Sequence, residues 1–152
     1  MPFNTKNIIH LPCNFYSCLD AMITFDFDDT LTRPVWSEFE LWFEPSNNPN
    51  YDSIARLLSF HEQGQEIRIV TTRFCRLEIV DFVEKYQLPI SAIHCTKGEL
   101  KGETLFSIGS NLHFDDSPDE AAHNQKWKIP TMLVSYHFDQ VEGREICSFD
   151  GC

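Results

Sequence analysis

The chain has 152 residues, which suits one domain with a sizeable core but not comfortably two. Hydrophobic residues make up 42% and charged residues 23%, so the composition is that of an ordinary globular protein rather than a disordered one. The net charge of −11 argues against a broad nucleic-acid surface, although one or two local cations could still hold a nucleotide. We expect neither a membrane span nor a secretory signal, since the sequence has no long apolar run and no basic segment that leads into one.

Strand and helix patterns alternate along most of the chain. Residues before Asp20 carry no clear period, and the apolar run at 22–27 predicts a buried strand. Residues 33–50 are rich in aromatic residues, proline and asparagine, and they predict an irregular segment. The later expected elements are a helix at 51–63 that stops at Gly64, a strand at 66–71, a helix at 75–87, a strand at 92–95, a helix from Lys101, a strand at 111–115, a helix at 118–125 capped by Ser117, and a strand at 131–135.

This alternation predicts an α/β fold, a Rossmann-like three-layer sandwich with a mainly parallel central sheet and right-handed crossovers. We expect one domain with its core at about 20–136, a small flap at 31–50, and peripheral segments at 1–19 and 137–152. In such sheets the ligand site lies outside the carboxyl ends of the strands. Polar residues do gather where apolar strands end: Asp26 and Asp28 after the first, Thr71, Thr72 and Arg73 after the second, and Asp115 and Asp116 after the strand at 111–115.

Asp26 and Asp28 are the most informative pair in the sequence. Side chains two residues apart on a strand point to the same face, so both carboxylates would project from the end of the buried strand. Two like charges side by side are costly unless a cation or a catalytic task separates their roles. Taken alone, the pair is equally compatible with an acidic turn that closes the strand, since Asp is common in turns.

Four segments in order resemble the motifs of the haloacid dehalogenase superfamily of phosphotransferases. The family pattern is an apolar strand followed by Asp-x-Asp-x-Thr, a strand ending in Thr or Ser, a lysine, and a strand ending in paired acids. Here the pattern reads Asp26-Phe27-Asp28-Asp29-Thr30, then Ile67-Arg68-Ile69-Val70-Thr71, then Lys101, then Leu112-His113-Phe114-Asp115-Asp116. The resemblance covers about residues 22–135, and four motifs in order are more specific than any one alone.

The resemblance implies a phosphatase that works through an aspartyl-phosphate. Asp26 would be the nucleophile, and Asp28 would be the general acid and base, since members with an acid at this position are usually phosphatases. Thr71 would donate a hydrogen bond to a phosphoryl oxygen. Lys101 would offset negative charge on the nucleophile and the phosphate.

The resemblance also implies Mg²⁺ as the cofactor, because a carboxylate that approaches a phosphate dianion needs a hard cation between them. Asp26, Asp116 and the backbone carbonyl of Asp28 would be direct ligands. Asp115 would support these ligands, and Asp119 could act through water.

Three assignments keep an alternative. Lys97 competes with Lys101, which we prefer because it opens a helix leading into the paired-acid strand. Thr71 is preferred over Thr72 as the phosphoryl donor because it is the first hydroxyl after the apolar run, and Thr72 would bind substrate, cap a turn or face solvent. Arg73 could hold a second phosphate or a carboxylate of the substrate, or form a salt bridge with a nearby acid.

The intervals between the motifs leave no room for a full cap domain, so the site is expected to be open. Capless members tend to act on large substrates or to borrow a lid from a partner subunit, which a homo-oligomer would supply. We expect a nucleotide, a phosphorylated nucleic-acid end or a phosphorylated protein as substrate, without an extended nucleic-acid surface. Trp36 and Trp42 could stack on bases, whereas Phe39 and Phe43 are expected to pack the flap onto the body.

The six cysteines show no spacing typical of a disulfide framework, so we expect free thiols in a reducing cytoplasm. A zinc site made by Cys13, Cys18, Cys147 and Cys152 is an alternative if the termini meet. His113 alternates with apolar residues and is expected to be a packed core residue. The tail at 142–152 is expected to be a surface strand or disordered.

The expected function is therefore Mg²⁺-dependent hydrolysis of phosphomonoesters by a cytoplasmic hydrolase. Two alternatives stay open: a non-catalytic module of the same fold that binds phosphate or a partner, and a phosphotransferase to an acceptor other than water. Loss of Asp26, Asp28 or the acid pair would favour the binding module, and none of these residues is lost.

Overall fold

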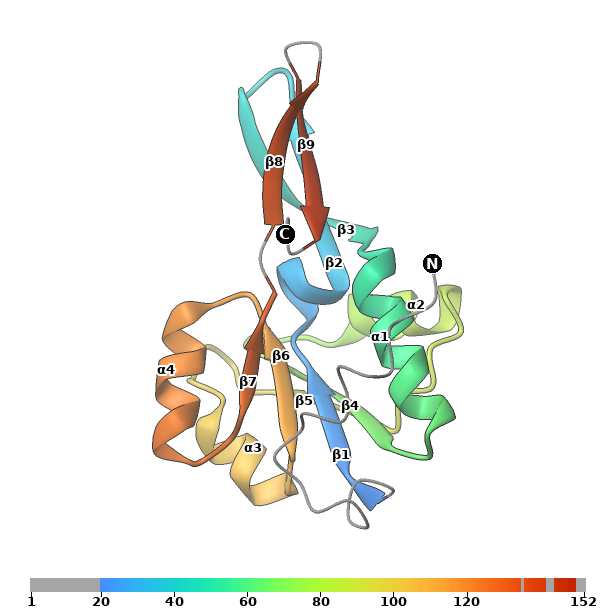
Figure 1. Cartoon of the computed structure of the whole chain (residues 1–152), viewed down its shortest axis with the longest axis vertical. Coiled ribbons are helices and arrows are strands. Elements are labelled where there is room, and N and C mark those ends of the chain that lie inside the picture. The colour runs from blue at the N-terminus through green and yellow to red at the C-terminus, as the bar shows by residue number, and fades with distance from the viewer. Residues whose placement is uncertain (1–19, 135, 142–143, 150–152) are drawn as a thin grey trace.

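A five-stranded sheet forms the centre of the molecule (Figure 1). The computed structural model describes the backbone of residues 20–134, 136–141 and 144–149, and the side chains of residues 20–134. All neighbouring strands of the sheet are parallel, so the expected α/β class with a mainly parallel sheet is confirmed. In the order in which they pair, the strands are β5 (Ala92–Cys95), β4 (Glu66–Thr71), β1 (Met22–Phe25), β6 (Leu112–Asp115) and β7 (Thr131–Leu133).

Helices cover both faces of the sheet (Figure 1). Apolar residues of α1 (Tyr51–Glu62) and α2 (Leu77–Lys85) pack with Phe25 and Phe114, whose rings stack across β1 and β6 at 4.6 Å. On the opposite face, residues of α3 (Gly102–Ile108) pack with Val70 in a smaller apolar cluster, together with Trp127 and Ile129, which follow α4 (Pro118–Lys126). The face covered by α1 and α2 therefore carries the larger of the two apolar clusters.

Short-range signals account for most helix ends. The side chain of Asn50 accepts a hydrogen bond from Ser53 N and starts α1, and Gly64 follows its end with a φ of +87°. Ser117 caps α4 by accepting from Glu120 N at 3.3 Å, with Pro118 in the first turn as expected. Gly102 begins α3 at a place where a Cβ atom would lie 2.7 Å from the ring of His123 on α4. This close approach brings the start of α3 against α4.

The segment expected to be irregular is instead an antiparallel hairpin of β2 (Thr32–Ser37) and β3 (Trp42–Pro49). The two strands were not predicted because the segment contains prolines and asparagines, which are depleted in strands. A two-stranded ribbon has two edges, where proline is tolerated, and the pairing shifts register between Arg33 and Val35, on either side of Pro34. Phe39 is 92% exposed at the turn, so the expectation that it packs the flap onto the body is wrong. Phe43 contacts the ring of Trp36 at 5.1 Å, which is a contact within the hairpin itself.

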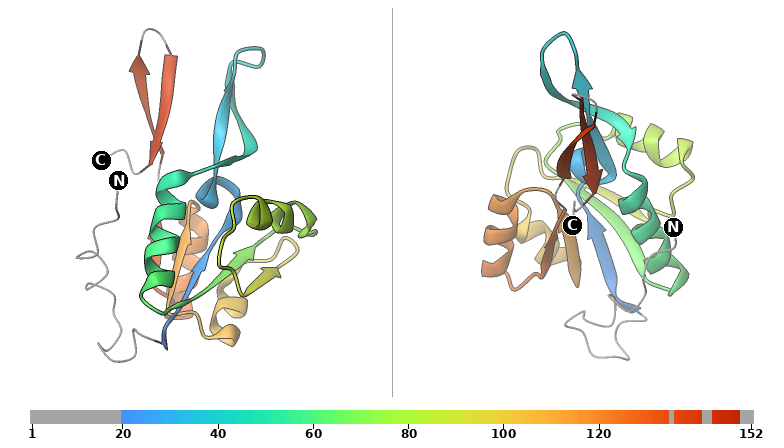
Figure 2. Two further views of the ribbon diagram at one scale, coloured as in Figure 1. Left: turned by 90° about the vertical axis from the view of Figure 1, so that its right-hand side faces the viewer. Right: turned by 45° about the horizontal axis from the view of Figure 1, so that its top comes forward.

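A second antiparallel hairpin, β8 (Tyr136–Val141) and β9 (Arg144–Phe149), follows β7. Both hairpins extend from the edge of the sheet at which the parallel strands end (Figure 2). Among the cysteines with described side chains, Cys75 and Cys95 are free thiols. The alternative zinc site lies outside the described residues, because it needs the thiols of Cys13, Cys18, Cys147 and Cys152.

Candidate active site

A hollow of about 200 Å³ opens where the chain reverses its direction across the sheet. From β1 the chain adds β4 and then β5 on one side, and it returns to add β6 and β7 on the other. Such a reversal leaves a crevice outside the carboxyl ends of the two strands that flank it, here β1 and β6. The hollow is lined by Asp26, Asp28, Asp29, Thr72, Lys101, Asp115, Asp116, Ser117 and Glu120.

Asp26 follows the last residue of β1, and its backbone N donates to Phe114 O of β6 at 2.8 Å. The next residues form an irregular helical turn, η3 (Phe27–Leu31), in which Asp29 has a φ of +58°. Asp is one of the few residues other than glycine that adopt this left-handed conformation readily. Asp28 thus reaches the hollow through a turn, and the alternation of an extended strand that we expected is not what places it.

Lys101 is the buried cation of the site. Its Nζ donates to Asp26 Oδ1 at 2.8 Å and to Asp115 Oδ2 at 2.6 Å, and its residue is 2% exposed. Burial disfavours the ammonium form, but the charges of the two carboxylates raise the pKa of Lys101 above its usual value. Lys97, the alternative lysine, is exposed on a loop, so the geometry favours Lys101 for the role beside Asp26.

Asp115 accepts more hydrogen bonds than any other carboxylate of the hollow that the structure describes. Its Oδ2 takes Lys101 Nζ and lies 2.9 Å from His113 Nε2, and its Oδ1 accepts from Ser117 N at 3.0 Å. Burial alone would raise the pKa of Asp115, but these donors and the charge of Lys101 outweigh burial and lower it to about 2. An oxygen with two donors has both lone pairs in use, so only Oδ1 keeps room for a further ligand.

A chain of buried polar groups continues behind Asp115. The Nδ1 atom of His113 lies 2.8 Å from Thr24 Oγ1, which lies 2.8 Å from Ser110 Oγ. Burial lowers the pKa of His113, so the ring is neutral and carries one N–H. Because an ionised carboxylate can only accept, we assign that hydrogen to Nε2, where it is donated to Asp115. The expected packed core residue is therefore also a polar support of the site.

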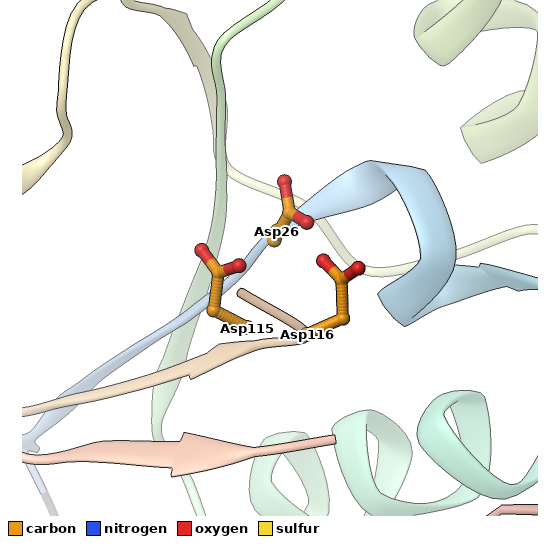
Figure 3. A group of neighbouring side chains, drawn as sticks. All are labelled: Asp26, Asp115 and Asp116. Atoms are coloured by element: carbon orange, nitrogen blue, oxygen red, sulfur yellow. The ribbon is translucent and has the colours of Figure 1, made fainter. Parts of the chain in front are cut away.

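Asp26, Asp115 and Asp116 offer carboxylate oxygens that all lie within 4.8 Å of one another, and their side chains converge in Figure 3. Burial raises the pKa of Asp26 well above its usual value, and Lys101 offsets only part of that rise. Burial and the charge of Asp115 also raise the pKa of Asp116, to about 6. Three carboxylates around one lysine leave the site short of positive charge.

The residues present fit a hard divalent cation. The donors are all carboxylate oxygens, which Mg²⁺ prefers, and few protein ligands leave positions for water and phosphate. Each oxygen of Asp26 accepts one hydrogen bond, from Lys101 or Thr30, and keeps a lone pair for such an ion, with Asp116 and Asp115 Oδ1 beside it. Asp29 Oδ1 is a further polar atom at the hollow, buried and without a hydrogen bond to the described residues.

Asp28 lines the hollow, but its carboxylate lies outside the acidic cluster. Its two oxygens accept from Arg73 Nε at 2.9 Å and from Nη2 at 2.7 Å. Arg73 therefore forms a salt bridge with Asp28, which is the alternative to substrate binding that the sequence left open. Of the ligand set that the resemblance implies, the structure brings the side chains of Asp26, Asp115 and Asp116 together. The ligand implied for Asp28 is its backbone carbonyl, which the side-chain salt bridge with Arg73 does not test.

The two threonines after β4 occupy different environments. Thr71 is fully buried, and its hydroxyl accepts from Arg73 N at 3.2 Å, which stabilises the loop after the strand. Thr72 lines the hollow. Of the two hydroxyls, that of Thr72 belongs to a residue of the hollow, and the assignment of Thr71 as the phosphoryl donor stays a prediction.

Sequence reasoning missed Glu120, which is buried at the hollow and accepts from Lys101 N at 3.0 Å. The signal was present in Ser117-Pro118-Asp119-Glu120, because a Glu three residues after a helix cap commonly binds a backbone N–H. Here the carboxylate binds a backbone N–H of another segment and ties α4 to the start of α3. Asp119, which could act through water in the implied mechanism, is exposed.

None of the helices in the described part of the chain has both the length and the apolar composition that crossing a membrane requires. In comparisons with known proteins, no protein-family model matches the chain, and no curated protein matches it significantly.

Proposed function

We propose that the protein is a Mg²⁺-dependent phosphomonoester hydrolase of the haloacid dehalogenase type, which works through an aspartyl-phosphate on Asp26. One observation carries the proposal: Lys101 joins Asp26 and Asp115 in one buried cluster although it lies 75 residues after Asp26 in the chain. Three of the four motifs, those that contain Asp26, Lys101 and Asp115, therefore meet in one cluster, and the second motif ends with β4 beside it. A chance match of scattered motifs would give no reason for such convergence.

The two oxygens of Asp26 have different partners. Oδ1 accepts from Lys101 Nζ at 2.8 Å, whereas Oδ2 has the longer contact, 3.3 Å from Thr30 Oγ1. Oδ2 is thus the oxygen that can attack phosphorus, while Lys101 fixes the orientation of the carboxylate. When bound, a Mg²⁺ ion supplies the positive charge that lets a carboxylate approach a phosphate dianion.

Two further groups complete the proposed chemistry. Asp28, at the rim of the hollow, would give a proton to the leaving oxygen and later take one from the water that attacks the phosphorylated Asp26. The hydroxyl of Thr72 would donate to a phosphoryl oxygen. Each bond broken at phosphorus is replaced by one bond formed, first to Asp26 and then to water, so no further co-reactant is required.

The intervals between the motifs contain only small elements in the described residues. The first holds the β2–β3 hairpin and α1, and the second holds α2 and β5. The hollow is thus covered by no separate domain in this part of the chain, which supports substrates whose phosphate sits on a larger body. We propose a nucleotide, a phosphorylated nucleic-acid end or a phosphorylated protein as the substrate.

Phosphate release from a panel of phosphomonoesters, with and without Mg²⁺, tests the proposal. The panel includes p-nitrophenyl phosphate, nucleotides, sugar phosphates, phosphopeptides and phosphorylated oligonucleotides, and the matched control is Asp26→Asn. We expect release that requires Mg²⁺ and is lost in the variant. Release that persists in Asp26→Asn would exclude the aspartyl-phosphate, and an inactive wild type that binds phosphate would favour the non-catalytic module.

A further inference from the structure

The guanidinium of Arg73 lies against Asp28, which lines the hollow, and several contacts hold it in place. The guanidinium lies over the buried ring of Phe27, with 5.0 Å between Cζ and the ring centroid. Nη1 donates to Glu78 Oε2 at 2.6 Å, and Nη2 approaches Asn47 Oδ1 of β3 at 3.4 Å. These contacts from three elements fix the plane of the fork, and such a fork matches a carboxylate or a phosphate with two parallel hydrogen bonds.

The remaining edge of the guanidinium, Nε and Nη2, holds Asp28. Both oxygens of Asp28 accept from this edge, so the intact pair directs the carboxylate toward Arg73 and away from the acidic cluster. The side chains of Arg73 and Asp28 are 26% and 38% exposed. The pair is partly open to solvent, so another anion can reach it, and an incoming carboxylate or phosphate would replace the two hydrogen bonds that Asp28 gives up.

We propose that Arg73 is the receptor for a second anionic group of the substrate, and that this group takes the place of Asp28 on the guanidinium. The inference rests on the proposed function, and it narrows the substrate class to phosphomonoesters that carry a further carboxylate or phosphate. Binding of the correct substrate then frees Asp28 for proton transfer. A substrate without the second anion leaves Asp28 on Arg73 and turns over slowly.

Matched substrates test the selectivity. Phenyl phosphate is compared with 3- and 4-carboxyphenyl phosphate for a carboxylate, and adenosine 5′-monophosphate with adenosine 3′,5′-bisphosphate for a phosphate. The exchange leaves the number of hydrogen bonds on Arg73 unchanged but frees Asp28 for proton transfer, so we expect a preference for the second anion of about tenfold to hundredfold in kcat/KM. The substrate series that shows the larger preference identifies whether the second anion is a carboxylate or a phosphate.

Arg73→Ala is expected to reduce the preference to less than about threefold, and Arg73→Lys, which keeps the charge but not the fork, to an intermediate value. Arg76→Ala is the matched control, because Arg76 is exposed three residues further on. Equal losses on substrates with one and two anions in Arg73→Ala and Arg73→Lys would overturn the proposal and leave Arg73 as a positioning residue for Asp28. A wild type without any preference in either series would overturn it as well.

A binding measurement separates this inference from the proposed hydrolysis. Calorimetry with phenylphosphonate and 4-carboxyphenylphosphonate, which are not hydrolysed, reports the second anion without turnover. Tighter binding of the carboxylated compound that is lost in Arg73→Ala would support the receptor even if no substrate released phosphate. Equal affinity for both compounds, with active hydrolysis of phenyl phosphate, would overturn the receptor and leave the hydrolase intact.

Discussion

His113 and Asp115 lie two residues apart on β6, and His113 Nε2 approaches, at 2.9 Å, the same Asp115 oxygen that accepts from Lys101. The ring of His113 thereby fixes the carboxylate of Asp115, and this carboxylate keeps Lys101 beside Asp26. His113 touches none of the reacting groups in the proposed mechanism, so it acts as a positioning residue.

His113→Leu is expected to lower the free energy of unfolding by about 1.5 to 3 kcal/mol, the usual loss for a hydrogen bond to a charged group. It is also expected to lower kcat more than it raises KM, because a misplaced Asp115 no longer fixes Lys101. His113→Gln is the matched variant, since its amide N–H can replace Nε2–H. Partial recovery of kcat in His113→Gln would support positioning, whereas equal kcat in all three proteins would contradict it.

Lys101→Met is expected to abolish turnover and to destabilise the fold. The substitution leaves Asp26 and Asp115 buried without their cation, and breaking a buried ion pair costs about 3 to 5 kcal/mol. Lys97→Met, on the exposed loop, is expected to change neither quantity. Steady-state kinetics and urea unfolding of both variants check the prediction, and the reverse pattern would move the catalytic lysine to position 97.

Asp116→Asn is expected to raise the stability of the metal-free protein and to weaken metal binding. Burial raises the pKa of Asp116 to about 6, so its ionised form at neutral pH destabilises the metal-free fold relative to the unfolded chain. Removing that charge should raise the metal-free melting temperature. In the wild type, Mg²⁺ at about 100 times its dissociation constant should add about 2.7 kcal/mol of stability, and the variant should lose most of this gain. A variant that melts lower without metal and keeps the full gain would exclude Asp116 as a ligand.

Gly102→Ala is expected to destabilise the protein by about 1 to 3 kcal/mol, because the added methyl group meets the rings of His123 and Trp127. Since Gly102 follows Lys101 directly, activity should fall together with stability. Ser107→Ala, at an exposed position of the same helix, is the control. Thermal unfolding of both variants beside their kcat values checks the expectation, and an unchanged Gly102→Ala would mean that α3 and α4 can separate without affecting the site.

Strands of the parallel sheet were the features that the sequence predicted best. The expected bounds of β4 and β5 agree with the structure, because short apolar runs bounded by polar residues and turns are typical of parallel strands. The β2–β3 hairpin was missed because its prolines and asparagines oppose the strand signal, and only pairing between the two segments overrides that preference.

The sequence predicted which residues form the site better than it predicted the contacts between them. Asp26, Lys101, Asp115 and Asp116 were named from motifs, and the structure brings them together. The pairing of Asp28 with Arg73 joins residues 45 apart in the chain, and no local pattern encodes it. His113 and Asp115 lie two residues apart, so the sequence placed both on one face of a strand, where they can form a hydrogen bond. Only the burial of His113 was predicted from that pattern.

The exposed loop at 97–100 divides the proposed chemistry between two parts of the chain. The part before it carries Asp26, Asp28 and Thr72, whereas the part after it carries Lys101 and the paired acids at the end of β6. Neither part alone can orient the nucleophile, because the hydrogen bond from Lys101 to Asp26 crosses this boundary. A chain cut in this loop should therefore be inactive as separate fragments and regain activity only when they reassociate, which makes hydrolysis a reporter of fragment complementation.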